Sequence, residues 1–338
     1  MKGWKITKPL TIEEGDIPET TDNVKMTKVR ITKCLITLPD ILHFNGEIEC
    51  ENVVPGSTGI GIVSEAETNF FDLEKGKHVY IQHTRECGKC YNCATGDFSN
   101  CSNLQVAGQD FEGFLTDFAN VPNNKLYLLP ENVSDFEALF IKHISLALCI
   151  VDQLKIQKGD YVAIVGGNNF GNILAQLIIY YQAVPIVLTQ DDEEYKIAKN
   201  SGIYYVFNKE DNWQKEVLNI TSGRLAENVV YIADSEIPAN KAFSLASNNA
   251  KVAFTGTVLK NSPIPFAQAI KKNLQILCIS DEHDNTASSI NLIANKAINL
   301  SELKLDATSY QAVPETFNKL HELFQKEGKI FETVVDMI

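Results

Sequence analysis

The chain has 338 residues, enough for two domains, and its 44% hydrophobic and 22% charged residues are typical of a globular protein. Its formal net charge of −13 repels nucleic-acid phosphates and anionic lipids, so neither nucleic acid nor a membrane is an expected partner. The N-terminal residues contain no apolar stretch of the kind found in signal peptides, and a cytoplasmic location is expected.

The predicted elements change in character about halfway along the chain. The first 150 or so residues read mainly as short strands bounded by turn residues, among them Val29–Thr32, Gly59–Val63 and His78–Ile81. After residue 155, strand-like runs alternate with segments of helical period. Such alternation predicts βαβ units and a parallel sheet. A helix at Ala312–Glu327 and a strand at Lys329–Val335 complete the prediction.

Four of the eight cysteines crowd into one short segment, at Cys87, Cys90, Cys93 and Cys101. Zinc takes four thiolates at tetrahedral corners, and three closely spaced cysteines plus a returning fourth can supply them. Four sulfurs close the coordination shell, so this zinc would be structural. Disulfides and an iron–sulfur cluster use the same residues, but disulfides suit a reducing compartment poorly and no redox partner motif is present. The other cysteines, Cys34, Cys50, Cys149 and Cys278, are expected to be buried.

A glycine-containing turn follows the predicted buried strand Tyr161–Val165 and precedes a helix. It reads Gly166, Gly167, Asn168, Asn169, Phe170 and Gly171. A dinucleotide pyrophosphate needs close backbone approach and a helix N-terminus. The ends of the G-x-G-x-x-G fingerprint are present, but Asn168 takes the place of the middle glycine. The prediction of a dinucleotide site therefore depends more on the strand–turn–helix context of this turn than on its match to the fingerprint.

Taken together, these segments resemble the medium-chain dehydrogenase/reductase family, in its zinc-type alcohol and polyol dehydrogenase branch. The resemblance covers nearly the whole chain and rests on 28–34, 74–79, 158–162 and the cysteine spacing. It implies an α/β protein with a GroES-like β-rich catalytic domain and a Rossmann doubly wound parallel-sheet nucleotide-binding domain. The implied boundaries are 1–153 and 299–338 for the catalytic domain, with a zinc lobe at about 84–104, and 154–298 for the nucleotide-binding domain.

The residues that hold the catalytic zinc in this family are replaced here. Thr37 stands at the cysteine position, and Ser57 and Thr58 stand where members carry His and Glu. Lys142 falls in the region of the third ligand. Hydroxyls bind zinc poorly and an ammonium group repels it, so the sequence predicts no catalytic zinc at these positions.

The leading hypothesis is therefore an NAD(P)H-dependent oxidoreductase that transfers hydride to or from a small polar substrate without catalytic zinc. Thr37, Ser57, Lys142 and Asp40 are the candidate catalytic residues, with Lys142 either stabilising negative charge or pairing with Asp40. One alternative is a non-catalytic binding relative with a degenerate site. A second is an alcohol or polyol dehydrogenase with displaced zinc ligands, such as Cys34, Asp40 or His43.

The resemblance also implies the cofactor site and the partners. Thr189 falls where NAD-dependent members carry an aspartate that binds the adenosine ribose. Loss of that carboxylate removes the repulsion of a 2′-phosphate, which gives NADPH a slight preference, although the acidic run at 191–194 opposes it. One structural zinc per chain, a small-molecule substrate and a homodimer or homotetramer complete the expectations.

Overall fold

The structure, a computed structural model, describes residues 1–18, 25–48, 52–66, 73–233, 237–257, 263–280 and 285–337. The chain divides into two units, one formed by Met1–Ile141 with Leu305–Ile338 and the other by Lys142–Lys304. Compared with the sequence-based boundaries, the second unit starts at 142 instead of 154 and ends at 304 instead of 298. The boundary at 142 places nearly all of helix α4 (Ile141–Leu154) in the second unit.

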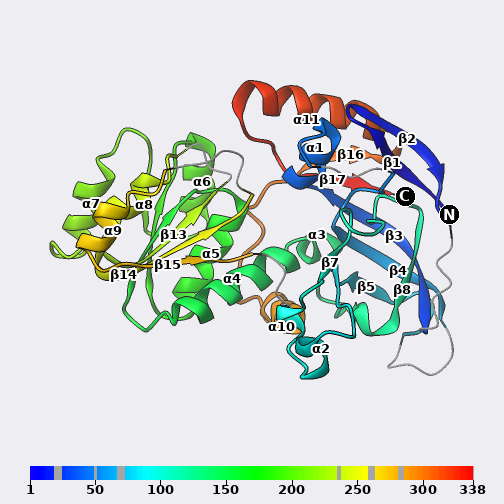
Figure 1. Ribbon diagram of the computed structural model, residues 1–338, viewed down its shortest axis with the longest axis horizontal. Coiled ribbons are helices and arrows are strands. Elements are labelled where there is room, and N and C mark those ends of the chain that lie inside the picture. Colours follow the sequence, from blue (N-terminus) through cyan, green and yellow to red (C-terminus); the bar gives the residue numbers. More distant parts are fainter. Residues whose placement is uncertain are drawn as a thin grey trace. The chain divides into compact units, whose positions relative to one another are not determined.

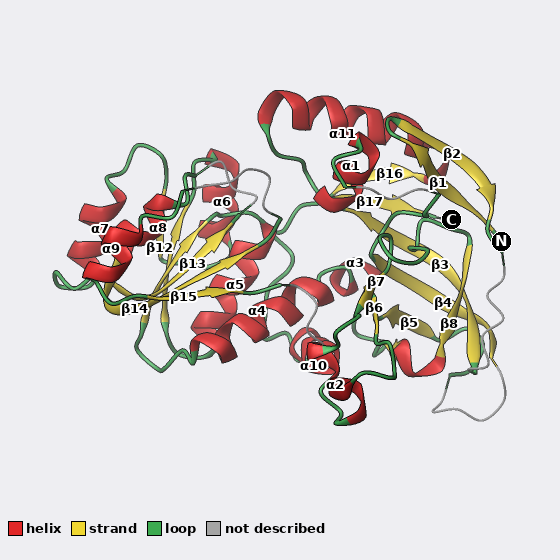
Figure 2. Cartoon of the chain, in the orientation of Figure 1, coloured by secondary structure: helices red, strands yellow, loops and turns green. Residues whose placement is uncertain are grey.

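The second unit is built on a six-stranded parallel sheet with helices on both faces (Figure 2). The strand order β12-β11-β10-β13-β14-β15 is the 3-2-1-4-5-6 order of the Rossmann fold. The order reverses between β10 and β13, which places the topological switch point at the end of β10. The strands are β10 (Tyr161–Val165), β11 (Val184–Leu188), β12 (Tyr205–Phe207), β13 (Ala226–Ile232), β14 (Ala246–Thr255) and β15 (Gln275–Cys278). The parallel sheet predicted from the alternating pattern and the Rossmann fold implied by the resemblance are thus confirmed.

The central strands of this sheet are apolar without alternation because both of their faces are covered. Every residue of Val162–Val165 is fully buried, as are the neighbouring Ile186–Leu188. Burial of a branched side chain is worth about 1.5–3 kcal/mol, so these strands anchor the unit. The helices that cover and connect the sheet are α5 (Asn169–Tyr180), α6 (Asp192–Asn200), α7 (Trp213–Ile220), α8 (Asn240–Leu245), α9 (Phe266–Lys271) and α10 (Thr286–Ala294).

The first unit is a β-rich lobe (Figure 1). Its main sheet has the order β16-β17-β3-β4-β5-β9, and β8 pairs with β3. The hairpin β1-β2 and the short ladder β6-β7 form separate two-stranded sheets. The strands are β1 (Lys2–Lys8), β2 (Thr11–Asp16), β3 (Met26–Ile36), β4 (Thr58–Ala66), β5 (His78–Ile81), β6 (Thr84–Arg85), β7 (Gln105–Val106), β8 (Phe118–Pro122), β9 (Leu126–Leu128), β16 (Asp306–Ser309) and β17 (Thr333–Asp336). The helices are α1 (Leu38–Asn45), α2 (Tyr91–Ala94), α3 (Asp135–Ala138) and α11 (Val313–Glu327).

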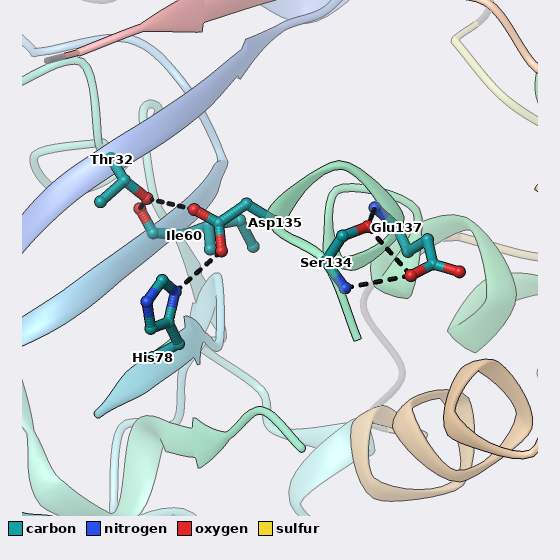
Figure 3. A network of polar contacts seen from close by, with 6 residues as sticks. All are labelled: Thr32, Ile60, His78, Ser134, Asp135 and Glu137. Carbon is teal, nitrogen blue, oxygen red and sulfur yellow. Dashed lines mark hydrogen bonds and ion pairs between the residues drawn. The ribbon is translucent and has the colours of Figure 1, made fainter. Parts of the chain in front are cut away.

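A polar network fixes α3 against the main sheet of the first unit (Figure 3). The Asp135 carboxylate accepts a hydrogen bond from Thr32 Oγ1 at 2.9 Å and lies 2.9 Å from His78 Nδ1. Ser134 and Glu137 cap the same helix reciprocally, since Glu137 N donates to Ser134 Oγ at 3.2 Å and Ser134 N donates to Glu137 Oε2 at 3.0 Å. The network therefore ties strands β3 and β5 to α3, just before the chain passes into the second unit at Lys142.

Three details differ from or extend the sequence-based predictions. The last strand begins at Thr333 rather than Lys329, because the Gly328 turn that ends α11 is followed by extended chain without ladder partners up to that point. Cys34 and Cys149 are buried as expected, whereas Cys278 is exposed on the edge strand β15, and Cys50 lies outside the described residues. None of the helices in the described ranges combines the length and apolar character needed to cross a bilayer.

Candidate functional site

The four clustered cysteines meet at one point of the first unit. Strands β6 and β7 pair at the base of the segment, with Thr84 opposite Val106 and Arg85 opposite Gln105. Between them α2 turns the chain, and its N-cap residue Cys90 accepts a hydrogen bond from Cys93 N through its sulfur. All four sulfurs lie within 4.8 Å of one another. The pairing at the base thus closes the loop that carries every ligand of the predicted lobe.

The spacing of these sulfurs suits a tetrahedral metal ion. Zinc–sulfur bonds of about 2.3 Å give a tetrahedron whose edges are about 3.8 Å long. The Sγ of Cys90 lies 3.5 Å from that of Cys93 and 4.0 Å from that of Cys101, and Cys87 Sγ lies 4.0 Å from Cys93 Sγ. A disulfide needs a sulfur–sulfur distance near 2.05 Å, which none of these pairs has. The geometry therefore fits a metal ion and does not fit the disulfide alternative.

Backbone amides favour the thiolate form at two of these ligands. Hydrogen bonds from the backbone at Lys89 and Cys90 lower the pKa of Cys87. Those from Cys93 and Ser102 lower the pKa of Cys90 to about 6. Desolvation raises the pKa of Cys93 to about 12, so the first two thiols lose their protons before the third. Since a thiolate is the form that binds metal, the loop is partly prepared for an ion.

Asp40 lies in the region where the family resemblance implies the ligands of a catalytic zinc. Its side chain is only 3% exposed and accepts three hydrogen bonds. Oδ2 accepts from Thr37 N at 2.8 Å and from Thr37 Oγ1 at 2.9 Å, while Oδ1 accepts from Gly56 N at 2.7 Å. Thr37 precedes α1 and Gly56 precedes β4, so one carboxylate joins two loops. The spacing Thr37-x-x-Asp40 is that of a helix capping box, a signal that the sequence contained.

Ser57 is 7% exposed and follows Gly56, whose amide donates to Asp40. The Asp40–Gly56 hydrogen bond therefore brings Asp40 next to the residue that precedes Ser57. The neighbouring Thr58 is 1% exposed and its Oγ1 has no hydrogen-bond partner. The structure thus brings together Thr37, Asp40 and Ser57 from two loops. Lys142 stands in the first turn of α4, in the other unit, and its part in the site stays a prediction.

The proposed displaced zinc ligands do not gather. Within the described ranges, the only group of three or more His, Cys, Asp or Glu side chains close enough to share an ion is that of the lobe cysteines. Cys34 is fully buried against Gly56, and burial raises the pKa of its thiol, with the charge of Asp40 adding to the effect. Burial also lowers the pKa of His43, against a smaller opposing effect of Asp40. The Cys34 environment therefore disfavours the thiolate form that a zinc ligand requires.

The glycine turn of the second unit has the close backbone packing that a dinucleotide site needs. Gly166 has φ +121°, a conformation that L side chains rarely adopt, and its amide donates to Leu188 O at 2.9 Å. A Cβ on Gly171 would lie 2.2 Å from Gly166 O, so only glycine allows this strand–helix approach. Asn168 is the N-cap of α5, and its Oδ1 accepts from Gly171 N at 3.0 Å. The Asn168 side chain thus lies against the start of α5 and accepts the hydrogen bond of one of the amides at the helix N-terminus.

The remaining residues of the turn help to fix it within the unit. Asn169 Nδ2 donates to Lys304 O at 2.9 Å, and Phe170 is 6% exposed with its ring 6.3 Å from that of His143. Thr189, at the end of β11, is 1% exposed and donates to Glu194 Oε2. A Cβ on Gly167 would lie 2.8 Å from Thr189 Cβ and 3.0 Å from Glu194 Oε2. The sequence shows Glu194 only as part of the acidic run at 191–194 and does not reveal these contacts.

Comparison with known proteins agrees with this architecture. The family model for the alcohol dehydrogenase GroES-like domain matches residues 24–131. An uncharacterised zinc-type alcohol dehydrogenase-like protein of Haemophilus influenzae is 24% identical over 93% of this chain and 92% of its own length. The crystal structure of an Escherichia coli alcohol dehydrogenase, RspB, with NADH matches with a TM-score of 0.86 at 22% identity, covering 100% of this chain and 99% of that one.

A zinc-binding dehydrogenase of Sinorhizobium meliloti, crystallised with NADP, matches with a TM-score of 0.87 at 19% identity over 99% of both chains. At this identity the structural likeness speaks for the fold alone. The chain thus contains an alcohol dehydrogenase GroES-like domain beside a unit with the Rossmann strand order. Along nearly its whole length it is similar to zinc-type alcohol dehydrogenase-like proteins.

Proposed function

We propose that this protein transfers hydride between a nicotinamide dinucleotide and a small polar substrate without a catalytic zinc, and that it keeps one structural zinc in the cysteine lobe. The observation that carries the proposal is the engagement of Asp40 with both Thr37 and Gly56. Thr37 and Ser57 stand where the family resemblance implies zinc ligands, and neither residue is a good ligand for zinc. Three hydrogen bonds to the buried Asp40 carboxylate join the two loops instead, and hydrogen bonds to a charged group are worth about 1.5–3 kcal/mol each.

The Thr37–Asp40 pair suggests how a proton would move. A hydroxyl has one proton to donate, and Thr37 gives it to Asp40. Toward a substrate, Thr37 Oγ1 therefore offers lone pairs and accepts. Such an arrangement suits a substrate hydroxyl or amine, whose proton Thr37 would receive while its own passes to the carboxylate. The dinucleotide, when bound, supplies the hydride acceptor or donor.

Metal analysis beside a dinucleotide titration tests this function. The purified chain should contain one zinc per chain, and nicotinamide fluorescence should change on addition of NADH or NADPH. Two zincs per chain would instead support the displaced-ligand dehydrogenase. Zinc content near one with no fluorescence change for either dinucleotide would overturn the catalytic proposal.

A second candidate, a non-catalytic binding relative, is favoured by one specific observation. The Asn168 side chain occupies the Gly171 amide, although dinucleotide pyrophosphates use the amides of such helix N-termini. Replacing Asn168 with glycine separates the two functions. If the substitution creates dinucleotide binding that the natural chain lacks, the protein is a non-catalytic relative whose site Asn168 has closed.

A further inference from the structure

We propose that Glu194 supplies the carboxylate that binds the adenosine ribose, so that this protein uses NADH in preference to NADPH. The inference rests on the proposed dinucleotide function and names the residue that decides which dinucleotide is taken. It replaces the slight preference for NADPH expected from Thr189 alone, because the sequence did not reveal where the side chain of Glu194 lies.

Glu194 reaches the required place from the helix rather than from the strand. Dinucleotide-binding units of this topology carry an acidic residue near the end of the second strand, close to the glycine turn. Here the second strand is β11, and Thr189 follows it. Thr189 Oγ1 donates to Glu194 Oε2, which joins the first turn of α6 to the end of that strand. The Glu194 carboxylate thus lies next to Thr189, which stands at the position where NAD-dependent members of the resembling family carry an aspartate.

The same Glu194 carboxylate lies close to the glycine turn, where the dinucleotide is predicted to bind. Glu194 Oε2 lies 3.0 Å from the point where a Cβ on Gly167 would be, and Thr189 Oγ1 lies 3.1 Å from that point. Gly167 lies between Gly166, at the end of β10, and the N-cap of α5, which is where a pyrophosphate approaches. An ionised carboxylate has about four acceptor sites, so one such group can accept from Thr189 Oγ1 and from ribose hydroxyls together.

The charges around Glu194 make a 2′-phosphate unfavourable. Asp191 caps α6 by accepting from Glu193 N at 2.7 Å and from Glu194 N at 3.2 Å, so the start of this helix is strongly acidic. Two lysine side chains pair with carboxylates of this turn: Lys304 Nζ lies 2.5 Å from Glu193 Oε1, and Lys209 Nζ lies 3.9 Å from Asp192 Oδ2. Four consecutive carboxylates, Asp191 to Glu194, thus begin the helix where NADPH would bring a dianionic phosphate, and their charges repel it.

The test is a fluorescence titration of the purified full chain with NADH and with NADPH, repeated for Glu194→Gln. We expect NADH to bind the natural protein about 10–100-fold more tightly than NADPH. The substitution removes the charge but keeps the shape, so it should weaken NADH binding about 10-fold and bring the two affinities close together.

Asp192→Asn is the matched control. It removes one carboxylate from the same helix turn, but Asp192 is exposed and pairs only with Lys209 among the contacts described for it. The control should leave the ratio of affinities within about 3-fold of that of the natural chain, and thermal unfolding of each variant verifies folding. If NADPH binds as well as NADH, or if Glu194→Gln and Asp192→Asn change the ratio equally, the assignment of Glu194 is overturned while the proposed function stands. If neither dinucleotide binds, both fail.

Discussion

Removal of the Asp40 carboxylate should destabilise the first unit more than any exposed carboxylate does. In Asp40→Ala, Thr37 N and Gly56 N lose their acceptor in a region that is largely closed to water. Each buried donor left unsatisfied costs about 1–3 kcal/mol, so the expected loss is roughly 2–6 kcal/mol of unfolding free energy. Total stabilities of domains are about 5–15 kcal/mol, so the effect is large. Asp40→Asn keeps one carbonyl oxygen and should lose only about 1–3 kcal/mol.

Urea unfolding measured by tryptophan fluorescence can assign this loss to the correct unit. The chain has two tryptophans, of which Trp4 lies in the unit of Asp40 and Trp213 in the other. In a Trp213→Phe background, Trp4 reports the first unit alone. Asp336→Ala is the control, because Asp336 is half exposed and pairs with Lys33 at the surface, a contact worth about 0–1 kcal/mol. An Asp40→Ala loss no larger than that of the control would refute the role given to this carboxylate.

Three further predictions concern the metal lobe, the glycine turn and a buried histidine. Cys101→Ser should reduce the zinc content measured by atomic absorption from one per chain to near zero, since a structural site loses much of its binding energy of about 10 kcal/mol or more with one ligand; unchanged zinc would contradict the lobe. Gly171→Ala should gain about 1 kcal/mol of helix propensity but lose more, because its Cβ would lie 2.2 Å from Gly166 O, and dinucleotide titration should show weaker binding. Gly15→Ala, whose Cβ would come no closer than 3.9 Å to Lys5, is the control that should bind normally. Burial lowers the pKa of His43, so the unfolded chain takes up its proton first and unfolding free energy should fall as pH drops below about 6.5 toward the folded-state pKa. In His43→Leu that part of the pH dependence should vanish, and an unchanged dependence in urea titrations from pH 8 to pH 5 would contradict the reasoning.

The fold could be predicted because its signals are local and repeated. Strands without polar alternation, followed by helical segments, occur several times after residue 155, and each repeat indicates the same parallel sheet. The cysteine lobe is equally visible, since the Cys87–Cys101 segment is short enough for sequence spacing to determine spatial distance. The Rossmann fold implied by the resemblance also sets the order of the strands, and the structure has that order.

The contacts of Asp40 in the proposed active site and of Glu194 in the proposed dinucleotide site could not be predicted from the sequence. The register of β3 and β4 sets Leu35 opposite Thr58, and this brings Gly56 to Asp40 across 16 positions of sequence. Similarly, Glu194 Oε2 accepts from Thr189 Oγ1 and lies 3.0 Å from where a Cβ on Gly167 would be, because the folded unit brings the first turn of α6 to the end of β11 and to the glycine turn. In both cases an acidic residue was visible in the sequence, but its partner was determined by tertiary structure.

The direction of the Thr37 hydrogen bond restricts the chemistry of the proposed active site. A catalytic zinc acts as a Lewis acid on a substrate oxygen, so a carbonyl or an alkoxide can bind to it. Thr37 Oγ1, with its proton given to Asp40, can only accept from a substrate, which favours groups that carry a hydrogen. Thr37→Ser preserves this arrangement, and Thr37→Val removes it at nearly constant volume. Across a panel of alcohols with NAD⁺ and of carbonyls with NADH, any turnover found should survive in Thr37→Ser and fall about 100-fold or more in Thr37→Val, as expected for loss of a proton acceptor. Equal turnover in both variants would mean that the substrate oxygen meets some other group, and the Thr37–Asp40 pair would then be only a brace between two loops.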